Sequence, residues 1–176
     1  MKNSLVFLFF LCLGICSAQE SHVTVSNEVL ENIKKDVWTP FMEAYDQLDS
    51  EKIKSIHTID IVRHMVDQNK IETGKDYLEN FGGFLESVRD RGNTLGIAFA
   101  ILNTAINETE DVAFQSGYYQ LSSQNKGDTS LVVRGYGYFN VGLRKENGTW
   151  RIWMDSDKRT DISKDDFNKC EIIYKL

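Results

Sequence analysis

The sequence predicts an α+β fold in which N-terminal helices pack on one side of a curved, mainly antiparallel sheet. The first part of the chain has helical periodicity, since apolar residues recur every three or four positions from Glu28 to Leu48. The second part consists of alternating segments separated by turn residues, and Asn147-Gly148 between two of them is a strong hairpin signal. Helices followed by an antiparallel meander are typical of the α+β class.

Each element follows from a local pattern of this kind. Pro40 interrupts the first helical pattern, so Thr39-Pro40 either opens a second helix or marks a kink. Helices are expected at residues 28–48, 51–56, 73–92 and 163–167. Strands are expected at residues 61–66, 95–106, 112–122, 131–145 and 149–158.

The composition is that of an ordinary folded domain and excludes several classes of protein. Of 176 residues, 41% are hydrophobic and 26% are charged, which argues against wholesale disorder. The 26 acidic residues outnumber the 20 lysines and arginines, so we expect no nucleic-acid partner. The mature chain divides into a flexible start at residues 19–27, one domain at 28–159 and a C-terminal tail with a short helix at 160–176.

Residues 1–18 have the pattern of a secretory signal peptide. Lys2 gives a positive start, an unbroken apolar run extends from Leu5 to Leu13, and cleavage is expected before Gln19. The run is too short for a permanent membrane span, so an uncleaved anchor is the less favoured alternative. We therefore expect a secreted or periplasmic protein with no stable membrane span after cleavage.

Several single residues and one longer motif occur in a family-like order across residues 26–159. They are Asp49, Asp60, Gly74, Ala113, Gly117 and the motif Arg144-Lys145-x-Asn147-Gly148-x-Trp150-Arg151-Ile152. On these marks the sequence resembles SnoaL-like and DUF4440-type members of the nuclear transport factor two-like superfamily. The resemblance implies a cone-shaped, cystatin-like fold with a pocket between the curved sheet and the long helix. It leaves the activity open, because the superfamily includes isomerases, cyclases, dehydratases, hydrolases and plain binding or dimerisation modules.

The resemblance directs attention to side chains that could act inside such a pocket. Enzymes of this superfamily usually use an Asp or His acid–base group helped by Tyr or Trp. His57 and Asp60 lie three residues apart at a predicted loop or helix end, where this spacing can bring them together as an acid–base pair. The alternative is that Asp60 caps a turn and His57 is solvated. The other expected pocket residues are Trp38, Tyr45, Arg63, His64 and Tyr118.

Asp155 follows the family-like motif, but the strand pattern points it away from the pocket. Strict alternation puts Trp150, Ile152 and Met154 on one face, and Trp153 and Asp155 on the other. If Trp150 and Ile152 lie in the core, Asp155 faces the pocket only where a β-bulge intervenes.

No metal or cofactor site is expected. The three histidines, His22, His57 and His64, have none of the spacings of known metal motifs, and no phosphate-binding glycine loop is present. Cys170 is the one cysteine outside the predicted signal peptide, so we expect no intramolecular disulfide.

Large aromatic residues gather on the face opposite the predicted core. Alternation places Tyr136, Tyr138 and Trp153 together on this face. Because Tyr and Trp are enriched in interface cores, and because the superfamily often dimerises through its sheet, we expect a homodimer built on this face. The competing explanation is that the apolar tail from Phe167 to Leu176 folds over the same patch.

The sequence therefore favours an exported domain whose pocket binds a small, partly apolar molecule. The first alternative is a lyase or isomerase that acts through His57 and Asp60. The second is a dimerisation or accessory module whose interior is filled by side chains.

Overall fold

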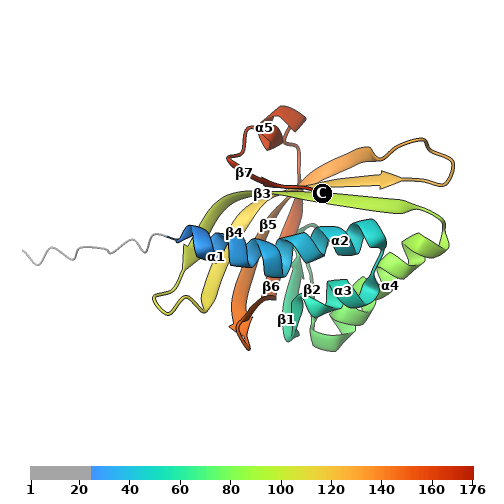
Figure 1. The fold of residues 1–176 in the computed structure, drawn as a ribbon. Coiled ribbons are helices and arrows are strands. Elements are labelled where there is room, and N and C mark those ends of the chain that lie inside the picture. The colour runs from blue at the N-terminus through green and yellow to red at the C-terminus, as the bar shows by residue number, and fades with distance from the viewer. Residues whose placement is uncertain (1–24) are drawn as a thin grey trace, which may run out of the picture.

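Helices from the start of the chain lie across one face of a curved, seven-stranded sheet (Figure 1). The computed structural model describes residues 25–176. The predicted signal peptide, its cleavage site before Gln19 and most of the 19–27 segment lie outside the described residues. The α+β class and the mainly antiparallel sheet are confirmed.

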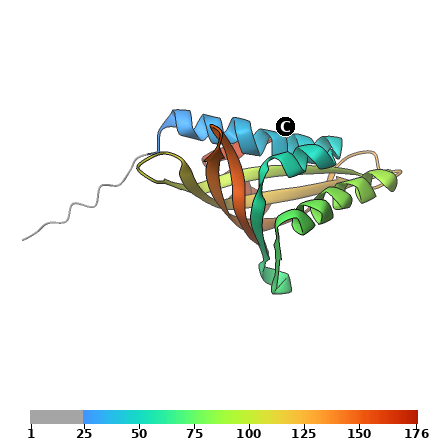
Figure 2. The ribbon, with the colours of Figure 1, turned by 90° about the horizontal axis from the view of Figure 1, so that it is seen from below.

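The sheet has the strand order β2-β1-β6-β5-β4-β3-β7, in which β1 pairs with β6 in parallel and every other neighbouring pair is antiparallel. In Figure 2 the teal strand β1 runs steeply across the direction of the yellow-green strands β3 and β4, so the sheet is strongly curved. The helices are α1 (Asn27–Ile33), α2 (Thr39–Gln47), α3 (Ser50–Ser55), α4 (Gly74–Asp90) and α5 (Lys164–Asn168), with the π-helical turn η1 (Lys34–Trp38) and the 3-10 turn η2 (Val66–Gln68). The strands are β1 (His57–Met65), β2 (Lys70–Thr73), β3 (Thr94–Ile106), β4 (Val112–Gln124), β5 (Val132–Glu146), β6 (Thr149–Thr160) and β7 (Ile172–Tyr174).

The first helix continues through Pro40. Proline has no N–H to donate to the carbonyl four residues earlier, and the chain widens just before it into η1, where the N–H of Thr39 donates to the carbonyl of Lys34. The residue before α2, Trp38, has helical backbone angles and makes no side-chain cap, so no new helix opens at Thr39-Pro40. α1, η1 and α2 therefore form one continuous element, which buries Trp38 and Tyr45 beneath it.

Strand β1 begins earlier than the strand predicted at 61–66. The N–H of Ile152 donates to the carbonyl of Ile56 at 2.9 Å, and this contact draws the chain from His57 onward into parallel pairing with β6. The sequence pattern predicts neither β2 nor β7, because three or four residues are too few to show alternation. The short helix predicted from Ser163 is confirmed, with Ser163 in a capping box.

A β-bulge in β6 changes part of the predicted face assignment. The pairing of β6 with β5 skips Trp153, so the alternation shifts by one residue there. Trp150 and Ile152 are fully buried, as predicted. The prediction that Met154 shares their face is wrong, because the bulge turns Met154 outward. Asp155 was expected to face the pocket only if a β-bulge intervened. The bulge is present, and Asp155 is buried on the inner side of the sheet.

Candidate functional site

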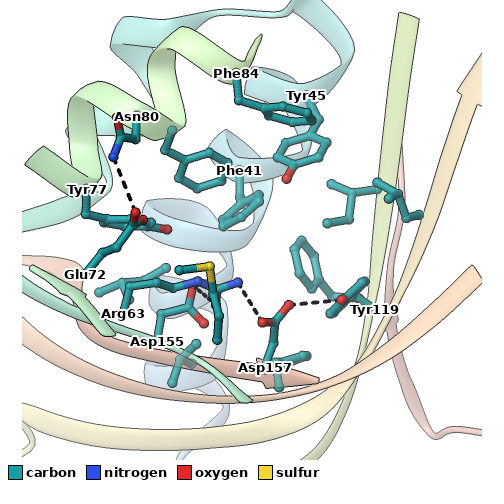
Figure 3. Close-up of a pocket in the computed structure, with 18 of the residues that line it drawn as sticks. Phe41, Tyr45, Arg63, Glu72, Tyr77, Asn80, Phe84, Tyr119, Asp155 and Asp157 are labelled. Atoms are coloured by element: carbon teal, nitrogen blue, oxygen red, sulfur yellow. Dashed lines mark hydrogen bonds and ion pairs between the residues drawn. The ribbon is translucent and has the colours of Figure 1, made fainter. Parts of the chain in front are cut away.

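A cavity of about 460 Å³ lies between α2, α4 and the inner face of the sheet (Figure 3). Its wall is largely aromatic and includes Trp38, Phe41, Tyr45, Tyr77, Phe81, Phe84, Phe99, Tyr119 and Phe139. Aliphatic side chains from the strands complete the wall, among them Ile97, Leu121, Val141 and Ile152. The cavity is therefore apolar over most of its surface. Charged groups gather at one end, which we call the floor.

The floor is an ion triad formed by Arg63, Asp155 and Asp157. Nη1 of Arg63 lies 2.8 Å from Oδ2 of Asp155, and Nη2 lies 2.7 Å from Oδ1 of Asp157. The hydroxyl of Tyr119 donates to the other oxygen, Oδ2, of Asp157 at 3.0 Å. The guanidinium thus bridges two carboxyl groups, and one of these is oriented further by a tyrosine (Figure 3).

The strand pairing explains why these three side chains meet. Arg63 and Asp155 are partners in the parallel register of β1 and β6. Asp157 is two residues further along β6 and so projects from the same face. A one-residue shift moves every later side chain to the other face, so Asp155 and Asp157 would point outward without the bulge at Trp153.

Burial and ion pairing have opposite effects on the pKa values of the floor residues. Desolvation raises the pKa of Asp155 above its usual range, although the charge of Arg63 opposes this. Desolvation also raises the pKa of Asp157. For Arg63, desolvation acts to lower the pKa, but Asp155 and the other nearby groups outweigh it and raise the pKa above the usual value. The floor therefore holds a permanent cation beside two carboxyl groups that accept protons more readily than exposed aspartates do.

Two buried tyrosines face the same space from the helices. Tyr45 of α2 is 9% exposed and Tyr77 of α4 is 5% exposed. Burial raises the pKa of both, so both hydroxyls are neutral. Neither hydroxyl has a hydrogen-bond partner within residues 25–176, and in Figure 3 the hydroxyl of Tyr45 points into the cavity. Each hydroxyl can donate to or accept from a bound molecule.

A buried polar chain fixes the indole of Trp38. Its Nε1 donates to Oε1 of Gln115 at 2.7 Å, and Nε2 of Gln115 donates to Oγ1 of Thr104 at 2.9 Å. The indole packs against Phe99 and Phe139, with ring centroids 4.5 and 5.2 Å apart. Trp38 is therefore a rigid part of the cavity wall.

The mouth of the cavity is marked by the lining residues that reach solvent. Phe84 of α4 is 43% exposed, and Gln68 of η2 is also exposed. Glu72 of β2 also lines the cavity, nearer Tyr77 and Arg63 than Phe84 in Figure 3, and its carboxylate contacts Lys70 and accepts a weak hydrogen bond of 3.4 Å from Asn80. The cavity therefore reaches solvent at α4 and at the turn η2 between β1 and β2.

Three of the five predicted pocket residues line the cavity: Trp38, Tyr45 and Arg63. The predictions for His64 and Tyr118 are wrong, because both project from the outer face of the sheet. Nδ1 of His64 lies 3.4 Å from Oγ of Ser156 there. Tyr118 packs edge-to-face on Tyr138, with ring centroids 5.7 Å apart.

The structure does not bring His57 and Asp60 together. Both lie in β1, whose pairing with β6 is irregular between His57 and Val62, and the two side chains have different surroundings. His57 is 4% exposed, and its Nδ1 lies 2.7 Å from the carbonyl oxygen of Ile53, so Nδ1 carries the proton. Asp60 accepts hydrogen bonds of 3.1 and 2.7 Å from Arg144 at the surface. The predicted contact is wrong, and the alternative of a solvated His57 is wrong as well.

Three further cavity residues, Tyr77, Tyr119 and Asp157, were not among those expected from the sequence. The spacing of Asp155 and Asp157 was a usable signal, since residues two apart on a strand share a face. For the neighbours Tyr118 and Tyr119, alternation shows that only one can face the cavity, but not which one.

Neither a metal-binding cluster nor a membrane-spanning helix is present within residues 25–176. No group of three or more His, Cys, Asp or Glu side chains among residues 25–176 is arranged to hold a metal ion. Over the same residues, no helix has the length and apolar character that a membrane crossing requires.

Solved structures of other proteins share this architecture. Aln2 from a Streptomyces species is 13% identical, with a TM-score of 0.65 over 77% of this chain and 93% of that one. A ketosteroid isomerase-like protein from Erwinia carotovora atroseptica is 20% identical, with a TM-score of 0.56 over 78% of this chain and all of that one. A nuclear transport factor two-like protein with a cystatin-like fold from Novosphingobium aromaticivorans is 13% identical, with a TM-score of 0.58 over 78% and 86% of the two chains.

These similarities establish the fold. The chain has the cystatin-like fold of nuclear transport factor two-like proteins, which confirms at the level of the fold the resemblance drawn from the sequence. No protein-family model and no curated protein matches the sequence. At these identities the fold leaves the activity open.

His57 predicts a pH dependence of stability. Burial lowers its pKa to about 4 from the ordinary value of 6.5. As the pH falls from 6.5 to 4 the unfolded chain binds a proton that the folded chain does not, so the free energy of unfolding should decline by about 3 kcal/mol. Chemical denaturation of the wild type and of His57→Gln across this range measures the difference.

Comparing the wild type with His57→Gln separates the effect of His57 on stability from the effects of Asp155 and Asp157. Because the pKa values of Asp155 and Asp157 are raised in the folded state, their contribution to stability has the opposite sign, and it is common to both proteins. His57→Gln should lack the decline that His57 causes. Parallel pH profiles for the two proteins would contradict this account.

Proposed function

We propose that this protein binds a small, partly apolar molecule in the cavity above the ion triad. The main support is a cavity of about 460 Å³ that has mostly aromatic walls and a charged floor. Ligand pockets typically have volumes of about 300–1,000 Å³ and combine apolar walls with a few fixed polar groups. The proposal includes export as a secreted or periplasmic protein, which rests on the pattern of residues 1–18.

The cavity favours this proposal over the two alternatives. An accessory module with a filled interior would leave no cavity of this size. A lyase or isomerase acting through His57 and Asp60 needs a contact between them, yet one is buried beneath α4 aromatic rings and the other is paired with Arg144 at the surface. Binding requires only the shape and the polar floor that are present.

Filling the cavity should abolish binding. Leu121 lies on the cavity wall and is half-buried, so Leu121→Trp places an indole in the space without removing a core side chain. We expect the affinity for the neutral fluorescent dye prodan, followed by its blue-shifted emission, to fall by about tenfold or more, a loss of about 1.4 kcal/mol.

Val132→Trp is the matched control. Val132 is 44% exposed and lines no part of the cavity, so this variant should bind prodan as the wild type does. Absence of prodan binding to the wild type, or equal binding by the wild type and Leu121→Trp, would contradict a binding function for this cavity.

The outer face of the sheet supports a second, separate proposal, a homodimer. Tyr138 and Trp153 lie on that face, and Tyr118 extends the patch. The C-terminal tail covers part of Tyr136, because Phe167 of α5 packs on it with ring centroids 5.6 Å apart. For this one residue the tail, rather than a second copy, supplies the cover. The rest of the tail extends the sheet as β7 at the opposite edge from β2. A second copy is therefore proposed to cover Tyr118, Tyr138 and Trp153.

Introducing a charge into this patch tests the dimer. We expect the wild type to scatter light with the mass of two chains, and Trp153→Glu to scatter with the mass of one, because an unpaired carboxylate in an interface is costly. Ile71→Glu is the control, since Ile71 is 65% exposed on β2, two strands away from the β6 strand that carries Trp153. A wild-type monomer at high micromolar concentration would contradict the dimer.

A further inference from the structure

The cavity lining holds more acidic than basic side chains. It contains the guanidinium of Arg63 and the carboxyl groups of Glu72, Asp155 and Asp157. Both terminal nitrogens of Arg63 already contact carboxylates, at 2.8 and 2.7 Å. A carboxylate or phosphate that entered this lining, as residues 25–176 form it, would meet groups of its own charge and no uncommitted cation. The electrostatics of the cavity therefore disfavour anions.

Asp155 is the less fully engaged of the two floor carboxyl groups. Asp157 uses both oxygens, one toward Arg63 and one toward Tyr119. Asp155 contacts Arg63 through Oδ2, and Arg63 is its one polar partner among the described residues. Its side chain is 11% exposed, and it lines the cavity. Its Oδ1 is therefore an acceptor available to a bound molecule.

The space opposite Asp155 also suits a positive charge. The hydroxyls of Tyr45 and Tyr77 lie on more than nine-tenths buried side chains, lack partners within residues 25–176 and can accept hydrogen bonds. The faces of aromatic rings carry negative potential and attract cations within about 6 Å. Aromatic side chains make up most of the wall, among them the indole of Trp38, which Gln115 holds in place.

We propose that the cavity binds an amine, a molecule with an apolar body and one protonated nitrogen that donates to Oδ1 of Asp155. This inference rests on the proposed function, because it specifies the ligand class of the same cavity. The tyrosine hydroxyls provide further acceptors for the ammonium group, and the aromatic walls contact the apolar body. Binding of a cation brings the excess negative charge of the lining closer to balance.

A matched series of probes tests the charge preference in the wild type. Naphthylethylamine, naphthylethanol and naphthylacetate share one apolar body and are cationic, neutral and anionic at neutral pH. By isothermal titration calorimetry, we expect the amine to bind about tenfold or more tightly than the alcohol, and the acetate about tenfold or more weakly than the alcohol.

Asp155→Asn assigns the preference to the proposed acceptor. This variant should bring the affinities for amine and alcohol within about threefold of each other, because the charged hydrogen bond is lost while the walls remain. Asp60→Asn is the matched control: it removes the same charge from an exposed residue outside the lining, and it should keep the wild-type preference. The wild-type series needs no variant, so it decides the question even if Asp155→Asn does not fold.

The outcomes separate this inference from the proposed function. If the alcohol binds as tightly as the amine, or the acetate binds most tightly, the amine inference is overturned while a binding cavity is upheld. If none of the three probes binds, the amine inference is overturned, and the prodan experiment alone then decides whether the cavity binds ligands.

Discussion

The structure depends on the balance of charge around one buried arginine. Removing a guanidinium from water costs several kcal/mol unless carboxylates pair with it at close range. Asp155 and Asp157 supply that pairing, and the side chain of Arg63 is only 15% exposed between them. The same contacts join β1 to β6, the one parallel pair of the described sheet. The ion triad therefore closes the cavity and holds the strand that carries Arg63 against the rest of the sheet.

The bulge at Trp153 allows a single strand to serve both the core and the cavity. Before the bulge, β6 directs Trp150 and Ile152 into the apolar core, and after it the strand directs Asp155 and Asp157 into the cavity. Trp153 itself lies against Gly142 of β5, where an added Cβ would come within 2.8 Å of the indole. Because Gly142 has no side chain, the indole of the bulged residue Trp153 fits against β5.

Local patterns in the sequence are sufficient for the fold class and for part of the site. The helical period from Glu28 to Leu48 and the Asn147-Gly148 hairpin signal predicted the layers, and Trp38, Tyr45 and Arg63, which were expected in the pocket, line the cavity. The failures have a common cause: a strand pattern gives relative faces, and a bulge or a shifted strand start exchanges them. His57 was assigned to a loop or helix end because its pairing with Ile152 of β6 depends on residues far along the chain.

The charge balance at Arg63 is tested most directly by the free energy of unfolding at neutral pH. Arg63→Met leaves two buried carboxyl groups without their cation and should lose about 3–5 kcal/mol. Replacing those carboxyl groups as well, in the triple variant that adds Asp155→Asn and Asp157→Asn, should restore more than half of the loss. Arg144→Met, which breaks a more exposed ion pair with Asp60, should lose no more than about 1 kcal/mol. An Arg63→Met protein as stable as Arg144→Met, or a triple variant less stable than Arg63→Met, would contradict the account.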